Sequence, residues 1–345
     1  MLSYLIKRVL LMLPTLLGAL TLTFVVVQFV PGGPVEQIMA EAGESASGAT
    51  EGFYSAGRDS DPRQVEELKK LYGFDKPPLQ RYLDMLWEFV RLDLGRSFQQ
   101  NKSVWALIVE KLPVSISLGV WSMLLSYAIS VPLGIAKAVR QGQRFDVITS
   151  LLVLLGYAIP GFVLGVLLIV LFAGGSFFEL FPLRGLTSDG WADMTWPQRI
   201  ADYGWHLTLP LICMTLGAFA VTTMLTKNAF LEEIRKQYVL VARAKGLSER
   251  TVLWKHVFRN ALIPLVTGFP AAFIGAFFAG SVLIETLFSL DGLGLLAYES
   301  VVRRDYPVVL GSLYLFTLLG LVVKLLSDVL YVLVDPRVQF GAMQR

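Results

Sequence analysis

The sequence predicts an all-α polytopic membrane protein. Of its 345 residues, 54% are hydrophobic and only 17% are charged, and the mean hydropathy is +0.60. The apolar residues come in long runs rather than at the spacing of an amphipathic surface. A stretch such as LLVLLGYAIPGFVLGVLLIVLF is apolar on every face, whereas the strands of a membrane β-barrel alternate in polarity. A bundle of transmembrane helices is therefore expected.

Six windows are long and apolar enough to cross a hydrocarbon core about 30 Å thick as helices of about 20 residues. The first follows Lys7 and Arg8, as a secretory signal would, but its apolar run exceeds a signal's usual length of about 7–15 residues. We therefore expect a retained N-terminal helix over residues 1–30, an external segment over 31–112, and a five-helix core over 113–345. The six windows lie near residues 9–30, 114–136, 147–172, 207–226, 263–285 and 308–334.

The distribution of Lys and Arg predicts the orientation in the membrane. Eight of these residues lie between Lys227 and Arg259, and others follow the second window and flank both termini. The opposite short loops hold only Arg184, Arg199, Arg303 and Arg304. Because short basic loops stay on the cytoplasmic side, both termini and the loop around residues 227–262 are expected in the cytoplasm.

The external segment divides into two parts. Residues 41–58 are small and polar, which predicts a mobile loop. Asp61, Pro62 and Gly73 then bracket a short predicted surface helix. Three aromatic residues further on are explained either by the membrane interface or by packing in a small external lobe. They are Tyr82, Trp87 and Phe89.

The sequence lacks the motifs of the common hydrolases. No Gly-Lys dipeptide occurs, so the chain has no P-loop and is not expected to hydrolyse ATP by that route. Two histidines, His206 and His256, and a single cysteine, Cys213, make no metal-ligand pattern. Neither GxSxG nor HExxH is present. A membrane enzyme is therefore disfavoured, and nothing indicates a nucleic-acid partner.

The most polar short loop follows the fourth window. Phe230, Ile234 and Val241 share one side of a helix, so we expect that span to continue out of the membrane as an amphipathic helix. Gly246 predicts its end and a tight turn, and Ser248 is a suitable N-cap for a second short helix.

That second helix is predicted to carry an apolar patch with a basic rim. Leu253 with Val257, and Trp254 with Phe258, are spaced four residues apart and flanked by Arg250, Lys255 and Arg259. Such a patch suits a groove on a soluble partner, but a basic loop lying on anionic lipid is equally consistent with the composition.

The run YVLVARAKGLSERTVLWKHVFRNALIP resembles the cytoplasmic coupling loop of ABC importer membrane subunits, in the variant of the oligopeptide, dipeptide and nickel importers. The resemblance continues through the N-terminal KRVLLMLPTLLGALTLTFVVVQFVPGGP, DLGRS, YAIPGFVLG, FPLRG, IETLFSLDGLGLLAYESVVRRDYPVVLG and DVLYVLVDPRV. The sequence departs from the family pattern at Leu240, Asp291 and Lys324. The external segment between Ala40 and Leu71 is similar to that of permeases for microcin C-like peptides and other oligopeptides.

This resemblance implies a type I ABC importer permease fold in a bacterial inner membrane. It implies that the chain pairs with a second homologous permease, with two ATPase subunits or one fused ATPase, and with a periplasmic peptide-binding protein. ATP and magnesium would then bind the ATPases and no cofactor would bind this chain. The resemblance assigns the ATPase-coupling loop to Ala242, Arg243, Ala244, Lys245, Gly246, Arg250, Leu253, Trp254, Lys255 and Val257.

Five further residues are candidates for the pathway or its gate. Lys324 and Asp328 are four residues apart in the last window, where they either neutralise each other or line the pathway. Glu285 could meet the amine of a passing peptide, although capping or pairing with Arg303 or Arg304 is the ordinary expectation. Gly292 and Gly294 predict a tight turn at the outer gate, after the fifth window.

A secondary transporter driven by an ion gradient is the alternative function. It predicts discontinuous helices in two repeated halves and paired acidic residues at the middle of the membrane. Pro160 and Gly161 interrupt one window only, with Pro270 a weaker candidate in another, and the sequence has no clear internal repeat. The importer interpretation is therefore preferred.

Overall fold

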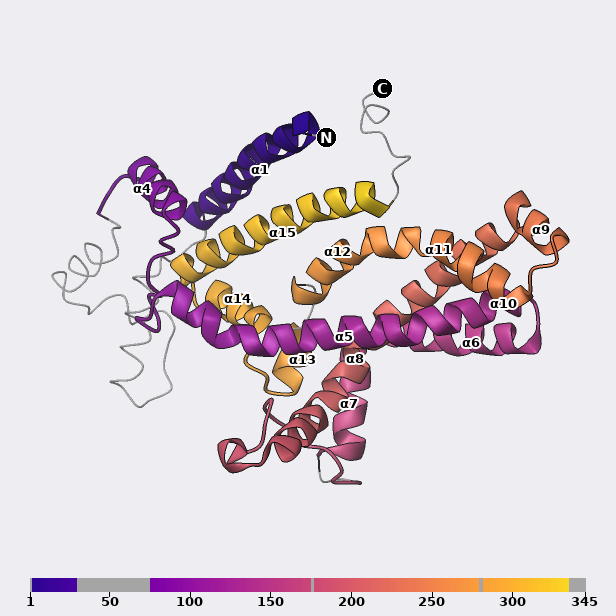
Figure 1. Cartoon of the computed structure of the whole chain (residues 1–345). Coiled ribbons are helices and arrows are strands. Elements are labelled where there is room, and N and C mark those ends of the chain that lie inside the picture. The colour runs from indigo at the N-terminus through magenta and orange to yellow at the C-terminus, as the bar shows by residue number, and fades with distance from the viewer. Residues whose placement is uncertain (1, 30–74, 175–176, 279–281, 335–345) are drawn as a thin grey trace. The chain divides into compact units, whose positions relative to one another are not determined.

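The computed structural model describes residues 2–29, 75–174, 177–278 and 282–334 (Figure 1). Within these ranges the chain is almost entirely helical, and an isolated bridge between Arg96 and Ser103 is the only β-type pairing. Contacts divide the chain into two compact units. Unit 1 comprises Pro113–Gly294 and the segment from Val322, and unit 2 comprises Leu2–Leu112 and Leu295–Leu321. The predicted mobile loop over 41–58 and the predicted helix over 61–73 lie outside the described residues.

Unit 2 is built on the N-terminal helix and a short helix that packs on its end. Its elements are α1 (Leu2–Phe29), α4 (Pro78–Val90), the start of α5 (Val104–Val139), most of α14 (Leu293–Val302) and the first half of α15 (Tyr306–Val334). A proline at the first position of α4 fixes the backbone for helix entry.

The aromatic residues of α4 favour packing over exposure at two of three positions. The Tyr82 ring lies 5.2 Å from Phe24 of α1, and the Phe89 ring lies 5.0 Å from Tyr314 of α15. Trp87, by contrast, is 59% exposed.

The DLGRS segment of unit 2 is anchored by a buried carboxylate. Asp305 is 3% exposed and accepts the Ser97 hydroxyl at 2.5 Å and the Phe98 N–H at 2.9 Å. Gly311 of α15 permits close packing beside it, because a Cβ there would lie 3.0 Å from Val104. The segment is thereby fixed against the start of α15.

Unit 1 contains the remaining long helices and the short elements between them. After α5 come α6 (Arg144–Ala158), α7 (Gly161–Phe172), η1 (Trp191–Asp193) and α8 (Trp196–Ile234). They are followed by α9 (Gln237–Ala244), α10 (Glu249–Thr251), the π-helix η2 (Val252–Val257), α11 (Phe258–Ala261), α12 (Ile263–Phe278) and α13 (Val282–Leu287).

Four helices among the described residues are long and apolar enough to span a membrane: Leu5–Phe29, Val104–Val139, Trp196–Ile234 and Tyr306–Val329. A bent pair, α6 and α7, meets the same test with a 90° bend at the predicted interruption, and would make a fifth span. The window near 263–285 corresponds to α12 and α13, with residues 279–281 between them outside the description. The predicted number of six spans therefore stays a prediction.

Two spans are longer than their apolar windows because polar caps extend them. The hydroxyl of Ser103 accepts the Ala106 N–H, so α5 begins ten residues before its predicted window at 114. A capping box between Thr195 and Gln198 starts α8 well before its predicted start at 207.

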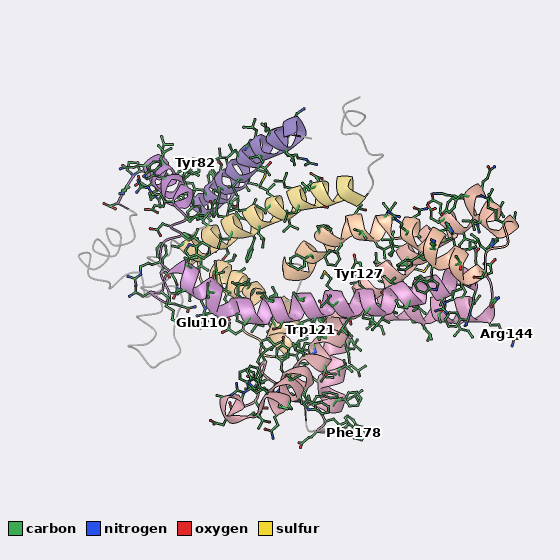
Figure 2. All side chains as sticks on the ribbon, viewed as in Figure 1. Tyr82, Glu110, Trp121, Tyr127, Arg144 and Phe178 are labelled. Atoms are coloured by element: carbon green, nitrogen blue, oxygen red, sulfur yellow. The ribbon has the colours of Figure 1, made fainter. Side chains whose placement is uncertain are left out.

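Side chains of α5 reach both α8 and α12 within unit 1. Trp121 and Tyr127, labelled in Figure 2, extend from α5. The Trp121 indole N–H donates to the Tyr203 hydroxyl at 3.2 Å, and the Tyr127 ring lies edge-on to Phe269 at 5.6 Å.

Small residues of α7 allow a close approach to α8. A Cβ on Gly161 would lie 2.8 Å from the carbonyl oxygen of Cys213, and one on Gly165 would lie 3.5 Å from the Cys213 sulfur. Cys213 is itself only 3% exposed, in the cluster of Leu207, Leu209, Ile284 and Phe288. The core of unit 1 is thus centred where α7, α8 and α13 meet.

Candidate functional site

The basic loop folds into a small helical module, which we call the loop module and define as residues 237–261. Figure 1 shows its elements α9, α10 and α11 after α8, and Ala138 near the end of α5 belongs to the same core. The prediction of one continuous amphipathic helix from the fourth span is wrong, because α8 ends at Ile234 and α9 begins at Gln237.

The interruption changes which side chains of α9 face inward. Lys236 has an extended backbone, with ψ 149°, so the hydrogen-bond ladder stops and the helical phase is reset. Val239 and Ala242 are buried at 0% and 7% exposure, whereas Val241, which was expected to share a side with Ile234, is 52% exposed.

Gly246 ends α9 as predicted. Its φ of +79° lies in the left-handed region, and its N–H donates to the Arg243 carbonyl at 2.9 Å. The Leu247 N–H donates to the Ala242 carbonyl at 3.4 Å, which completes a Schellman motif. The Arg243 guanidinium then reaches Glu249 with two hydrogen bonds of 2.7 and 3.2 Å and so bridges the turn.

The predicted N-cap at Ser248 is confirmed, since its hydroxyl accepts the Thr251 N–H at 3.4 Å. The helix that follows begins as the single α-turn α10 and continues over Val252–Val257 as a π-helix, rather than as the α-helix expected from spacing. Its five-residue hydrogen bond runs from the Phe258 N–H to the Leu253 carbonyl, so residues five apart align, and Val252 and Val257 are both fully buried.

The wider turn separates the residues that the sequence groups into one patch. Val257 packs into the core and Leu253 lies partly buried against it. Trp254 is 57% exposed, and its ring lies 5.0 Å from Phe258, so that predicted pair is present.

The loop module rests on its own core and on the end of α5. Buried Phe230 of α8 and Ala138 of α5 belong to this cluster, together with Val239, Ala242, Val252, Val257 and Ala261. The Tyr238 hydroxyl donates to Glu233 at 2.7 Å and accepts from the Asn260 amide at 3.2 Å, which ties α9 to α8 and α11. Burial raises the pKa of this hydroxyl.

The exposed side of the loop module is apolar and basic. Besides Trp254, three apolar side chains are exposed that sequence reasoning did not assign to the site: Leu240, Val241 and Leu247. The orientation of α9 reveals Leu240 and Val241, whose spacing suits either face, and Leu247 follows the turn at Gly246. Ala244 is exposed as well.

Three cations accompany these apolar groups. Lys245, Arg250 and Lys255 are exposed and make no ion pair within the described part of the chain. Two of these cations, Arg250 and Lys255, line a shallow hollow together with Thr251 and Trp254. An exposed aromatic ring beside cations that make no ion pair in the described part of the chain suits a partner surface that is both grooved and acidic.

The predicted gate residues Glu285 and Gly292 come together in unit 1. Glu285 is fully buried on α13, and a Cβ on Gly292 would lie 2.5 Å from its carboxylate carbon. Gly292 is therefore required by this close approach and not by a positive φ. The next residue along, Leu293, donates its N–H to the Ser115 hydroxyl at 2.8 Å, and Gly294 lies in the first turn of α14.

The charged residues of the last helix do not form the pair that their spacing permits. Lys324 is exposed and Asp328 is partly buried on α15, and no ion pair between described residues joins them. Nearby, the Ser327 hydroxyl donates to the Thr267 carbonyl of α12 at 3.3 Å. A role for Lys324 and Asp328 in the pathway stays a prediction, as does one for Glu285.

Comparisons with known proteins agree with the sequence motifs. Residues 130–340 match the family model of the binding-protein-dependent transport system inner membrane component. A peptidoglycan transport system permease protein YejB of Agrobacterium fabrum is 56% identical, covering 98% of each chain. An inner membrane ABC transporter permease protein YejB of Escherichia coli O157:H7 is 52% identical, over 98% of this chain and 99% of the relative.

The fold is also similar to a solved structure. A chain from an inward-facing conformation of the MetNI methionine ABC transporter aligns with a TM-score of 0.50 at 19% identity. The alignment covers 67% of this chain and 97% of the other. The likeness supports an importer permease fold.

Proposed function

The chain belongs to the family of binding-protein-dependent transport system inner membrane components, and from this premise we propose that it forms half of the translocation pathway of an ATP-driven peptide importer. The other half would be a second, homologous permease. ATP hydrolysis, with its magnesium, would take place on two ATPase subunits or one fused ATPase, because this sequence contains no P-loop.

The surface of the loop module is the main support for this proposal. Trp254 projects from a base in which Val239, Val252 and Val257 are fully buried, and its ring packs against Phe258 at 5.0 Å. A pre-positioned aromatic side chain in a polar rim is typical of an interaction hot spot. The unpaired cations around it would steer an acidic partner during encounter.

The rigid base indicates how a partner's movement would reach the membrane helices. ATP binding would close the two ATPases, bring the paired loop modules together, and shift the bundle from an inward-facing to an outward-facing state. Because the module core includes Phe230 of α8 and Ala138 of α5, a displacement of the module would displace both helices. The module would therefore act as a lever that transmits movement of the ATPases to these two helices.

The substrate class is proposed from the relatives. A permease that is 56% identical is named for peptidoglycan transport, so peptides released from peptidoglycan are one candidate cargo. Because the external segment is similar to that of microcin C-type permeases, other oligopeptides are a second candidate cargo. A periplasmic binding protein would deliver either cargo, and the chain would lie in a bacterial inner membrane in contact with lipid.

Purification from native membranes tests the assembly. A tagged chain should recover a second permease and at least one P-loop ATPase, identified by mass spectrometry. The assembled complex in proteoliposomes, given its binding protein, should accumulate labelled peptide only when ATP is supplied on the side of the membrane that carries the ATPases.

Competition between the two cargo classes then distinguishes the substrates. An unlabelled peptidoglycan-derived peptide that blocks uptake of a linear oligopeptide would indicate a shared pathway. Uptake that persists without ATP, and that an ionophore abolishes, would instead establish a secondary transporter and refute the proposal.

A further inference from the structure

A buried cluster of three charges lies next to the loop module and joins three helices of unit 1. Lys137 on the last turn of α5, Asp146 on the first turn of α6 and Lys227 of α8 form it. Their side chains are 0%, 7% and 13% exposed. In the sequence, both lysines look like ordinary basic residues of cytoplasmic loops. Their burial becomes apparent only in the folded structure.

Lys137 uses its full hydrogen-bonding capacity inside the protein. Its ammonium group donates to the Asp146 carbonyl at 3.0 Å, the Thr149 hydroxyl at 2.9 Å and the Ser150 hydroxyl at 2.7 Å. An ammonium group has three protons, so all three are used by α6. The Asp146 carboxylate lies a further 3.3 Å away.

Asp146 is the centre of the cluster. Its two carboxylate oxygens accept from Lys227 at 2.6 and 2.8 Å, and one of them also accepts the Gly142 N–H at 3.1 Å. Two cations on one buried carboxylate leave the cluster with a net positive charge. Buried charges are costly to separate, because a displaced partner leaves the other ion without water or counter-charge.

The cluster adjoins the core of the loop module along two helices. Lys137 directly precedes Ala138, and Lys227 lies one turn before Phe230, both of which belong to that core. The α5 and α8 backbones are in close contact here, since a Cβ on Gly134 would lie 2.8 Å from the Thr223 carbonyl oxygen. Lys137 and Lys227 bind the start of α6 to this pair through its carboxylate and hydroxyl groups.

We propose that Asp146, held by Lys137 and Lys227, is a positioning residue that makes α6 move with α5 and α8 when the loop module is displaced. Hydrogen bonds between buried ions are directional and short, so one arrangement of the three helices satisfies all of them. The proposal rests on the proposed function, since it concerns how a displacement of the module is transmitted.

Lys227→Met is the cleanest test. It leaves Lys137 and Asp146 as a balanced pair and removes only the ion pair between α6 and α8. The complete importer, with its ATPases and binding protein, is reconstituted in proteoliposomes, and peptide transported per ATP hydrolysed is measured. We expect normal assembly and ATP hydrolysis with at least a tenfold lower ratio, and recovery of at least half the ratio in Lys227→Arg.

Two further variants complete the test. Ser150→Ala removes one acceptor of Lys137 without removing a charge, and should lower the ratio about threefold. Lys102→Met removes an exposed ion pair with Glu110 elsewhere on α5 and should leave the ratio unchanged. If Lys227→Met does not assemble, Ser150→Ala decides alone.

The outcomes separate this inference from the proposed function. A wild-type complex that moves no peptide with ATP would refute the importer proposal itself. A wild-type complex that transports, with an unchanged ratio in the assembled Lys227→Met and Ser150→Ala variants, would overturn only the role of Asp146.

Discussion

Two glycine turns, at Gly246 and Gly292, look alike in sequence and are required for different physical reasons. Gly246 lies at the exposed tip of the loop module with φ +79°, and a Cβ added there would have no neighbouring atom within 4 Å. Gly292 has no positive φ, but a Cβ would lie 2.5 Å from the buried Glu285 carboxylate. One turn needs the backbone freedom of glycine, and the other needs its missing volume. The cost of substitution should therefore be far higher at Gly292.

The largest effect expected is that of Gly292→Ala. The added methyl group must displace a fully buried carboxylate, and overpacking of this kind costs about 3 kcal/mol. Thermal unfolding in detergent should show a markedly lower midpoint and a lower yield of folded protein.

A matched glycine provides the control for that result. Gly217→Ala on α8 has nothing within 4 Å of the new methyl group and should be neutral or slightly stabilising, because alanine favours helix. In the Gly292→Ala background, Glu285→Ala should restore part of the stability by making room. Wild-type stability in Gly292→Ala alone would contradict the steric explanation.

Trp254→Asp should have the next largest effect, and on assembly rather than folding. The ring is 57% exposed, so the fold should persist, but losing an aromatic hot spot costs about 2 kcal/mol of binding, or about 30-fold in Kd. Affinity of the purified permease pair for its ATPase measures this. Trp87→Asp, which alters a residue that is 59% exposed on α4, should leave that affinity unchanged. Equal losses in both variants would show that the loop module is not the docking surface.

Gly246→Ala should be milder, at about 1 kcal/mol of local strain, because an L-residue disfavours the left-handed region. Gly246→Asn should cost less than Gly246→Ala, since asparagine tolerates that region. Peptide transported per ATP should follow the order glycine, asparagine, alanine. An alanine variant that outperforms the asparagine variant would mean that conformation is not what this position requires.

Arg250→Ala should have the smallest effect, chiefly on the rate of ATPase association. The side chain is exposed and makes no ion pair within the described residues, so it can act in steering. We expect an association rate about threefold lower at low ionic strength and equal to wild type at about 1 M salt, where charges are screened. A loss that is independent of salt would indicate a direct packing role instead.

Sequence reasoning reached the helical membrane fold and the family, whereas the assignment of the site residues stays a prediction. Long apolar runs reveal spans, and short-range signals reveal caps, so the Gly246 stop and the Ser248 cap were both predictable. The orientation of α9 was not, because two residues at Arg235 and Lys236 reset its phase. The π-helix was also missed, since its hydrogen-bond register has no local sequence signal and follows from packing Val252 and Val257 into one core.

Contacts between distant segments account for the rest. The approach of Glu285 to Gly292 depends on the path of the chain after α13, and glycine alone does not distinguish a strained turn from a crowded one. The burial of Lys137 depends on acceptors from α6, while its position after an apolar window suggests an exposed basic loop. In both cases the burial of the charged residue, Glu285 or Lys137, is recognised only when the residues that surround it in the fold are known.

The burial of Cys213 has a practical consequence for spectroscopy. It is the only cysteine of the sequence, and its sulfur lies against Gly165 beneath α7, shielded from reagents in solution. An engineered thiol at an exposed position such as Ala244→Cys would therefore be the only one open to a maleimide fluorophore or a spin label. Movements of the loop module could then be followed through a transport cycle without first replacing a native residue.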